Sequence, residues 1–140
     1  MTKKMIAGND YSSILKDIKN IIAKARYNTF TAINTEMLKA YFEIGRKIVE
    51  EEQKGGKRAG YGERLLELIS EELTEEFGRG FDSSNLRRMR RFYQIYQKWG
   101  TVSPKLAWSH YCELIKIDEK IKREYFQRYT EQENLRQYIH

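Results

Sequence analysis

Residues 81–100 read FDSSNLRRMRRFYQIYQKWG, and this stretch carries the pattern that decides the fold. Apolar side chains recur along it at the three- and four-residue spacing of one helix face, while Arg and Gln side chains occupy the other face. The apolar members are Leu86, Met89, Phe92, Tyr93, Ile95, Tyr96 and Trp99. The stretch therefore predicts an amphipathic helix over about residues 85–99, with a capping residue in the DSS run at 82–84.

Helical periodicity extends over most of the 140-residue chain. Apolar positions repeat through residues 11–53 with a break in register between Ala25 and Phe30, which predicts either two helices or one kinked helix. The glycines of QKGGKRAGYG (53–62) end that segment, and a helix follows at 63–77. Ser103 and Asp118 begin two further helical patterns. Because no segment alternates with the two-residue period of a strand, the sequence predicts an all-α fold with five or six helices.

The length suits one domain, so we expect a single helical domain over residues 11–140 behind a flexible N-terminal tail at 1–10. No apolar run reaches the roughly 18–20 residues of a membrane span, and the N-terminus lacks the apolar stretch of a secretory signal. We therefore expect a cytoplasmic protein with no membrane segment. A lone Cys112 and two histidines form neither an internal disulfide nor a zinc site of the usual spacing, so no metal or cofactor is expected.

The net charge of +6 is concentrated in one part of the chain. Between residues 79 and 105 a single acid, Asp82, stands against seven basic residues, and the rest of the chain balances at 19 basic and 19 acidic residues. The seven are Arg79, Arg87, Arg88, Arg90, Arg91, Lys98 and Lys105. This asymmetry indicates one basic surface on an otherwise balanced molecule.

The four arginines at 87, 88, 90 and 91 crowd near the start of the predicted helix. Like charges three and four residues apart repel, and cations near a helix N-terminus oppose its dipole, so something outside the helix must compensate. One compensator is a bound polyanion. The other is an internal network with the acidic face of the preceding helix, at Glu71, Glu72, Glu75 and Glu76.

Two helices at about 63–77 and 85–99, joined by a short glycine-containing turn, are typical of a helix-turn-helix. Arg binds phosphate or guanine edges, and Gln can bind adenine, so we favour nucleic acid over the internal network. Arg88 lies among apolar positions of the helix, and we expect it to snorkel or to pair. A basic helix does not by itself distinguish DNA from RNA. The predicted contact face is Arg87, Arg90, Arg91, Gln94 and Lys98.

Two other segments supply candidate phosphate contacts. KGGKRAGYG (54–62) places Lys57 and Arg58 before a helix N-terminus, where backbone N–H groups can hold a phosphate, although a solvated loop explains it equally well. WSHY (108–111) suggests aromatic core packing, with Ser109 or His110 contacting phosphate. His110 has no cysteine or carboxylate at nucleophile-activating spacing, so no catalytic role is expected for it.

The strings YFEIGRKIVEEEQKGGKRAGYGERLLELISEEL, EFGRGFDSSNLRRMRRFYQIY, LAWSHYCELIKI and KREYFQRY occur in this order. In order and spacing they resemble the N-terminal domain of the YhcG-type family of bacterial PDDEXK nucleases, over about residues 14–129. The resemblance implies a helical DNA-binding domain that precedes a metal-dependent nuclease domain. It also implies that the four arginines belong to the family's NL-RMR-FY segment, and Ser109 and His110 to its WSHY segment.

The chain ends at His140, where relatives continue into the nuclease domain. A PDDEXK site needs an acidic residue and a Glu-x-Lys on adjoining strands, whereas the nearest strings, EQK (52–54), DIK (17–19) and DEK (118–120), fall in or at the ends of predicted helices. We therefore expect a non-catalytic DNA-binding domain without the nuclease domain, which would be its partner.

The alternative function is a protein–protein interaction module. In that case the chain would be an amphipathic bundle that forms a homodimer or docks another protein, with aromatic side chains as anchors. The candidate anchors are Tyr11, Tyr27, Tyr41 and Trp99.

Overall fold

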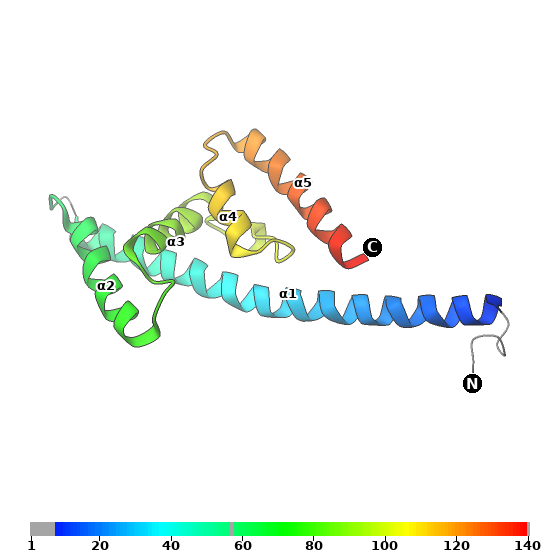
Figure 1. Ribbon diagram of the computed structural model, residues 1–140. Coiled ribbons are helices and arrows are strands. Elements are labelled where there is room, and N and C mark those ends of the chain that lie inside the picture. The colour runs from blue at the N-terminus through cyan, green and yellow to red at the C-terminus, as the bar shows by residue number, and fades with distance from the viewer. Residues whose placement is uncertain (1–7, 57, 140) are drawn as a thin grey trace.

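The protein is a group of helices assembled on one long helix (Figure 1). The computed structural model describes residues 8–56 and 58–139. The elements in chain order are α1 (Gly8–Gly55), α2 (Tyr61–Phe77), α3 (Ser83–Tyr96), the 3-10 turn η2 (Trp99–Thr101), α4 (Trp108–Leu114) and α5 (Lys120–Ile139). No strand occurs in these residues, so the predicted all-α fold is confirmed, with five α-helices.

Helix α1 is continuous over 48 residues, which decides between the two alternatives that its sequence allowed. The break in register changes which side of the helix is apolar without interrupting the backbone. Its C-terminal half packs against the other helices, whereas its N-terminal half extends away from the compact part of the molecule (Figure 1). Residues 8–10, which lie in the expected N-terminal tail, form the first turn of this helix, and residues 1–7 are outside the described part.

Helix α3 lies at the centre of the fold and makes its most extensive contact with α1. Its side chains Leu86, Met89 and Phe92 are fully buried. The two helices cross closely at Gly45, where an added Cβ would lie 2.1 Å from the carbonyl oxygen of Met89. A glycine inside a helix normally destabilises it, so the close crossing explains why one stands at position 45.

The buried side chains form two clusters that meet at α3. One cluster contains Leu38, Phe42 and Phe92 together with residues of α4, and the other contains Ile48 and the α2 residue Leu66. The partly buried rings of Tyr41 and Trp108 contact both clusters, and their centroids are 4.7 Å apart. The two clusters therefore act as one continuous core, with α3 passing through it.

The ends of two helices differ from the sequence-based prediction. A residue of the DSS run caps α3 as expected, and it is Asp82, since its Oδ1 atom accepts a hydrogen bond from the Asn85 backbone N–H at 2.8 Å. However, α3 ends at Tyr96 and not at residue 99, because Gln97 adopts a left-handed backbone with φ 47°. Helix α4 begins only at Trp108, because long-range side-chain bonds hold residues 103–106: the Tyr111 hydroxyl bonds to Ser103, and the Asn34 amide donates to the Pro104 carbonyl at 2.9 Å.

Candidate nucleic-acid interface

The polar side of α3 carries the predicted contact residues. Arg87, Arg91 and Gln94 lie four and three residues apart, which places them in one row along the helix. Arg91 and Gln94 are exposed and Arg87 is half-buried. Lys98 is also exposed, but it lies beyond the end of α3, so it is not part of the helical row.

Three of the four arginines have acidic partners from three different segments. Arg87 Nη2 lies 2.6 Å from Oε2 of Glu63, at the start of α2. Arg91 Nη2 lies 3.2 Å from Oδ1 of Asp118, which precedes α5. The third pair joins Arg90 Nη1 to Oε2 of Glu52 in α1, at 3.1 Å. The internal compensation that the sequence suggested is therefore present, although its acidic members are different.

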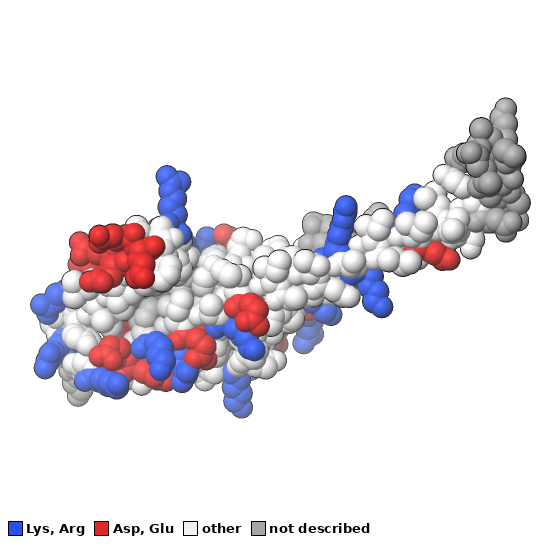
Figure 2. Space-filling model, turned by 90° about the horizontal axis from the view of Figure 1, so that it is seen from below, with Lys and Arg blue, Asp and Glu red and all other residues white. Residues whose placement is uncertain are grey.

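The prediction that acidic residues near the end of α2 pair with the arginines of α3 was wrong. Among the described residues, none of Glu71, Glu72, Glu75 and Glu76 forms an ion pair with α3, and all four are exposed. The reason is their position on the helix: at about 100° per residue, Glu71 and Glu75 point away from the buried Leu66, whereas Glu63 lies near the edge of the buried side. Figure 2 shows one dense patch of acidic side chains on the compact part of the molecule, and other acidic side chains there lie among basic ones.

The three ion pairs differ in exposure, and the difference separates their roles. In the Arg87–Glu63 pair the side chains are 40% and 53% exposed, and in the Arg91–Asp118 pair they are 46% and 89% exposed. The hydrogen bond from Arg87 lowers the pKa of Glu63 below its ordinary value. Exposed pairs of this kind contribute little to stability, so both arginines can exchange a carboxylate for a phosphate at small cost.

The Arg90–Glu52 pair is more enclosed, with side chains 21% and 26% exposed. The Oε1 atom of Glu52 is buried and has no hydrogen-bond partner, so Arg90 supplies the positive charge that this carboxylate needs. Gly62 permits the approach of α2 to the pair, because a Cβ there would lie 2.5 Å from Oε2 of Glu52. The predicted contact residue Arg90 is thus placed in an internal pair that joins α1 to α3.

Of the two alternatives expected for Arg88, pairing is not observed among the described residues, and the exposure of its side chain agrees with snorkelling. Its side chain is exposed, and it forms no ion pair with any residue that the structure describes. Arg88 acts electrostatically on Cys112 of α4: burial raises the pKa of the Cys112 thiol, and the positive charge of Arg88 opposes that rise. Of the four arginines, Arg88 therefore keeps its charge most available to an external anion.

The WSHY segment is mainly structural. Trp108 Nε1 donates to Oδ1 of Asn85 at 3.0 Å, and Tyr111 is fully buried, so the predicted packing of these two aromatics is confirmed. His110 Nδ1 accepts a hydrogen bond from the Ala107 backbone N–H at 3.0 Å and so caps α4. His110 and the exposed Ser109 line a hollow together with residues of α5, and their contact with phosphate stays a prediction.

The loop before α2 contains the two predicted phosphate contacts Lys57 and Arg58, of which the structure describes one. Arg58 is exposed there, as a phosphate contact would require, and Lys57 lies outside the described residues. Gly60 has a left-handed backbone with φ 73° and stands at the N-cap of α2 without a side-chain capping bond. The loop therefore precedes a helix start, as its glycines predicted.

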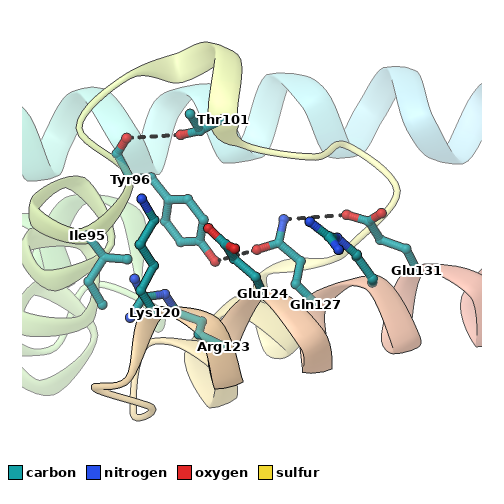
Figure 3. A pocket seen from close by; sticks show the side chains of 9 residues that line it. Ile95, Tyr96, Thr101, Lys120, Arg123, Glu124, Gln127 and Glu131 are labelled. Carbon is teal, nitrogen blue, oxygen red and sulfur yellow. Dashed lines mark hydrogen bonds between the residues drawn. The ribbon is translucent and has the colours of Figure 1, made fainter.

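A second hollow, which sequence reasoning missed, lies between the end of α3 and α5 (Figure 3). The Tyr96 hydroxyl donates to Oε1 of Gln127 at 2.9 Å, and Arg123 donates to the Ile117 carbonyl at 2.8 Å. Burial raises the pKa of Tyr96 to about 12. The Tyr96–Gln127 bond joins α3 to α5, whereas the Arg123–Ile117 bond holds the start of α5 to the segment before it.

Within the part of the chain that the structure describes, no three His, Cys, Asp or Glu side chains come together as a group that could hold a metal ion. The described helices also include none that is long and apolar enough to cross a membrane.

Fold and surface together define a small all-helical domain that presents an arginine-rich helix beside its core. The family model described as the DUF1016 N-terminal domain matches residues 17–138, and the chain belongs to this family. It is also 42% identical over 87 residues to a protein of Escherichia coli (strain K12) named "Putative nuclease YhcG". That match covers 62% of this chain and 23% of the relative, so the chain corresponds to less than a quarter of that protein. No solved structure matches the chain.

The resemblance to the YhcG-type N-terminal domain is therefore confirmed.

Proposed function

We propose that this chain is a non-catalytic, helix-turn-helix-type DNA-binding domain that targets a nuclease to its substrate. The observation that carries the proposal is the row of Arg87, Arg91 and Gln94 on the outer side of α3, with Arg88 and Lys98 exposed nearby. The name of the E. coli relative supports it, because a nuclease acts on nucleic acid. The partner that follows from this relationship is a C-terminal nuclease domain, which would supply the catalytic residues.

The arrangement of α2 and α3 supports the helix-turn-helix interpretation. The two helices are consecutive, they are joined by residues 78–82, and they contact each other. The second helix of such a unit lies in the major groove and contacts base edges near its N-terminus. Arg87 stands in the first half of α3, where those contacts would be made, Arg91 lies one turn further along, and Gln94 could bind an adenine edge.

The ion pairs of α3 are compatible with this function if the carboxylates are displaced by phosphates. In the free domain Glu63 and Asp118 would hold Arg87 and Arg91 in place. Charge-assisted hydrogen bonds to phosphate would replace these exposed pairs on binding. Arg90 would keep its partner Glu52, so we assign it to positioning α3 and not to DNA contact.

The test is a fluorescence-anisotropy titration of a labelled 20–25 base-pair duplex at several salt concentrations. If Arg87, Arg88, Arg91 and Lys98 each neutralise one phosphate, log K should fall with log salt at a slope of about −3.6. The Arg87→Ala/Arg91→Ala variant should bind at least 10-fold more weakly, with a slope reduced by about 2. Its matched control is Lys39→Ala/Lys47→Ala, which removes the same charge from exposed positions on α1.

Equal losses in the two double variants would mean that net charge alone matters, and the α3 assignment would be wrong. An affinity that does not change with salt would overturn DNA binding altogether. A matched RNA duplex titrated in parallel decides between the two nucleic acids. Plasmid incubated with Mg²⁺ and this chain should stay intact, which checks that the domain is non-catalytic.

A further inference from the structure

The projecting half of α1 carries an apolar stripe that no described part of the molecule covers. Ile14, Ile18, Ile21 and Ile22 are 57%, 46%, 67% and 47% exposed, and the small Ala25 continues the row. Large contiguous apolar surfaces are uncommon on monomeric proteins and mark interaction sites. Four exposed isoleucines within nine positions of one helix therefore need a partner.

The stripe faces away from the protein's own core. At about 100° per residue, Ile14, Ile18, Ile21 and Ala25 lie on the side of α1 roughly opposite to the core residues Asn34, Leu38 and Phe42. The helices α3, α4 and α5 pack around the core side, so none of these helices buries the stripe within the part of the chain that the structure describes. Its occupant must come from outside the described fold.

We propose that residues 11–28 of α1 pair antiparallel with the same segment of a second copy of this chain. The spacing of Ile14, Ile18, Ile21 and Ala25 is 4, 3 and 4 residues, which is the seam pattern of a two-helix coiled coil. In an antiparallel pair, Ile18 faces Ile21 of the second copy, and Ile14 then faces Ala25 of the second copy. Every apolar residue of the seam meets an apolar residue.

The flanking charges select the second copy and its direction. Asp17 and Lys24 are both exposed and stand on the same flank of the seam, seven residues apart. In the antiparallel register set by Ile18, Asp17 lies opposite Lys24 of the second copy, and the symmetry repeats this pair once. In a parallel pair each of these charges would instead lie opposite the apolar flank that carries Leu15 and Ile22. The opposite flank of the antiparallel pair brings Leu15 against Ile22 of the second copy, so apolar side chains meet there too.

The shape of the molecule permits this pairing. Residue 34, the first buried position of α1, would lie beyond the N-terminal end of the partner helix in this register. The two compact parts therefore sit at opposite ends of the paired helices, on sides that face away from the seam. The sequence-based anchors Tyr41 and Trp99 take no part, because Tyr41 packs on Trp108 and Trp99 packs on Phe42 within one chain. This inference does not depend on DNA binding.

Sedimentation equilibrium over a range of protein concentrations tests the proposal without DNA. The wild-type chain should form a dimer, and Ile18→Lys should weaken dimerisation by about 100-fold or more, because it places a charge in an apolar seam. The matched control is Ile121→Lys on α5, at a position that is 84% exposed and lies outside the seam. A wild-type monomer at every concentration up to the millimolar range overturns the proposal, as does a dimer lost in the control and kept in Ile18→Lys.

Charge reversal tests the antiparallel register. Asp17→Lys alone and Lys24→Asp alone each create two repulsive pairs and should weaken the dimer by about 5- to 30-fold. The double reversal restores both pairs and should return the dissociation constant to within about 3-fold of wild type. A double variant as weak as the product of the single variants rules out this register, and circular dichroism at a concentration where all variants are monomeric confirms equal folding.

Discussion

The two halves of α1 share one helix but not one role. From Asn34 to Gly55 the apolar side chains turn inward, with Leu38, Phe42 and Ile48 buried against α3 and its neighbours. From Gly8 to Ile33 the five isoleucines are exposed, and none of the described apolar side chains is buried. Both halves carry apolar residues at helical spacing, yet the first half contributes to no core cluster. Helical periodicity thus identifies an apolar face, whereas the register of that face decides whether it belongs to the core or to an interface.

Asn34 marks the boundary between the halves. It is 8% exposed, and its amide Nδ2 donates hydrogen bonds to the carbonyls of Pro104 and Leu106. These bonds satisfy a buried polar group and tie the 103–107 segment to α1. Between the N-terminus and Asn34, none of the described α1 side chains is buried.

The two halves of α1 should differ most in how much stability is lost when one large apolar side chain in each half is replaced by alanine. Leu38→Ala, at a fully buried position, should reduce the free energy of unfolding by about 2–5 kcal/mol, because it leaves a cavity in the core. Ile18→Ala should cost an amount that depends on protein concentration, because its contacts are made only in the dimer. Urea unfolding at two protein concentrations measures both. A concentration-independent cost above 2 kcal/mol for Ile18→Ala would remove the distinction between the halves.

The close helix crossing in the packed half should make one glycine sensitive. Gly45→Ala should reduce the free energy of unfolding by about 1–3 kcal/mol, because the added Cβ would meet the Met89 carbonyl at 2.1 Å and force α1 and α3 apart. Gly8→Ala is the matched control, since no atom lies within 4 Å of a Cβ placed there, and its stability should be unchanged or slightly raised. Equal effects of the two substitutions in urea unfolding would show that α1 and α3 do not cross this closely.

The enclosed ion pair of α3 should contribute more to stability than the exposed ones. Arg90→Gln should cost about 1–2 kcal/mol, because it leaves the half-buried carboxylate of Glu52 without a positive partner. Arg91→Gln should stay within about 0.5 kcal/mol of wild type, since Asp118 is free to bind water. In DNA titrations the order should reverse, with Arg91→Gln the more damaging. If Arg91→Gln is less stable than Arg90→Gln, the exposed Arg91–Asp118 pair stabilises the fold more than the enclosed Arg90–Glu52 pair, and the division by exposure is wrong.

The smallest expected effect concerns alkaline pH. Because burial raises the pKa of Tyr96 from 10.0 to about 12, the folded state favours the neutral phenol. Its contribution to stability is complete below about pH 10 and is lost as the pH rises through about 12. Tyr96→Phe should therefore lose less stability than wild type between pH 9 and pH 11 in thermal unfolding. Tyr125→Phe, which removes a tyrosine hydroxyl at a position that is 65% exposed, is the matched control.

Several features of the fold and the candidate site were predictable from local patterns. The spacing of Leu86, Met89 and Phe92 identified the buried side of α3, and the DSS run at 82–84 was identified as the source of its cap. The role of Gly45 was missed, because a glycine within a helix carries no local sign of which backbone will pass over it. The extended segment before α4 was missed as well, because Asn34, about 70 residues earlier, and the Tyr111 hydroxyl hold it in place.

What the sequence determined by itself is the helical class, the amphipathic faces, the family and the concentration of positive charge in one helix, because these depend on residues a few positions apart. Only the tertiary structure decided which acids compensate the arginines, since Arg87, Arg90 and Arg91 meet partners 24, 38 and 27 residues away. It also decided that one apolar face of α1 is core and the other is exposed. Both outcomes depend on which helices pack side by side, and helical periodicity carries no information about that choice.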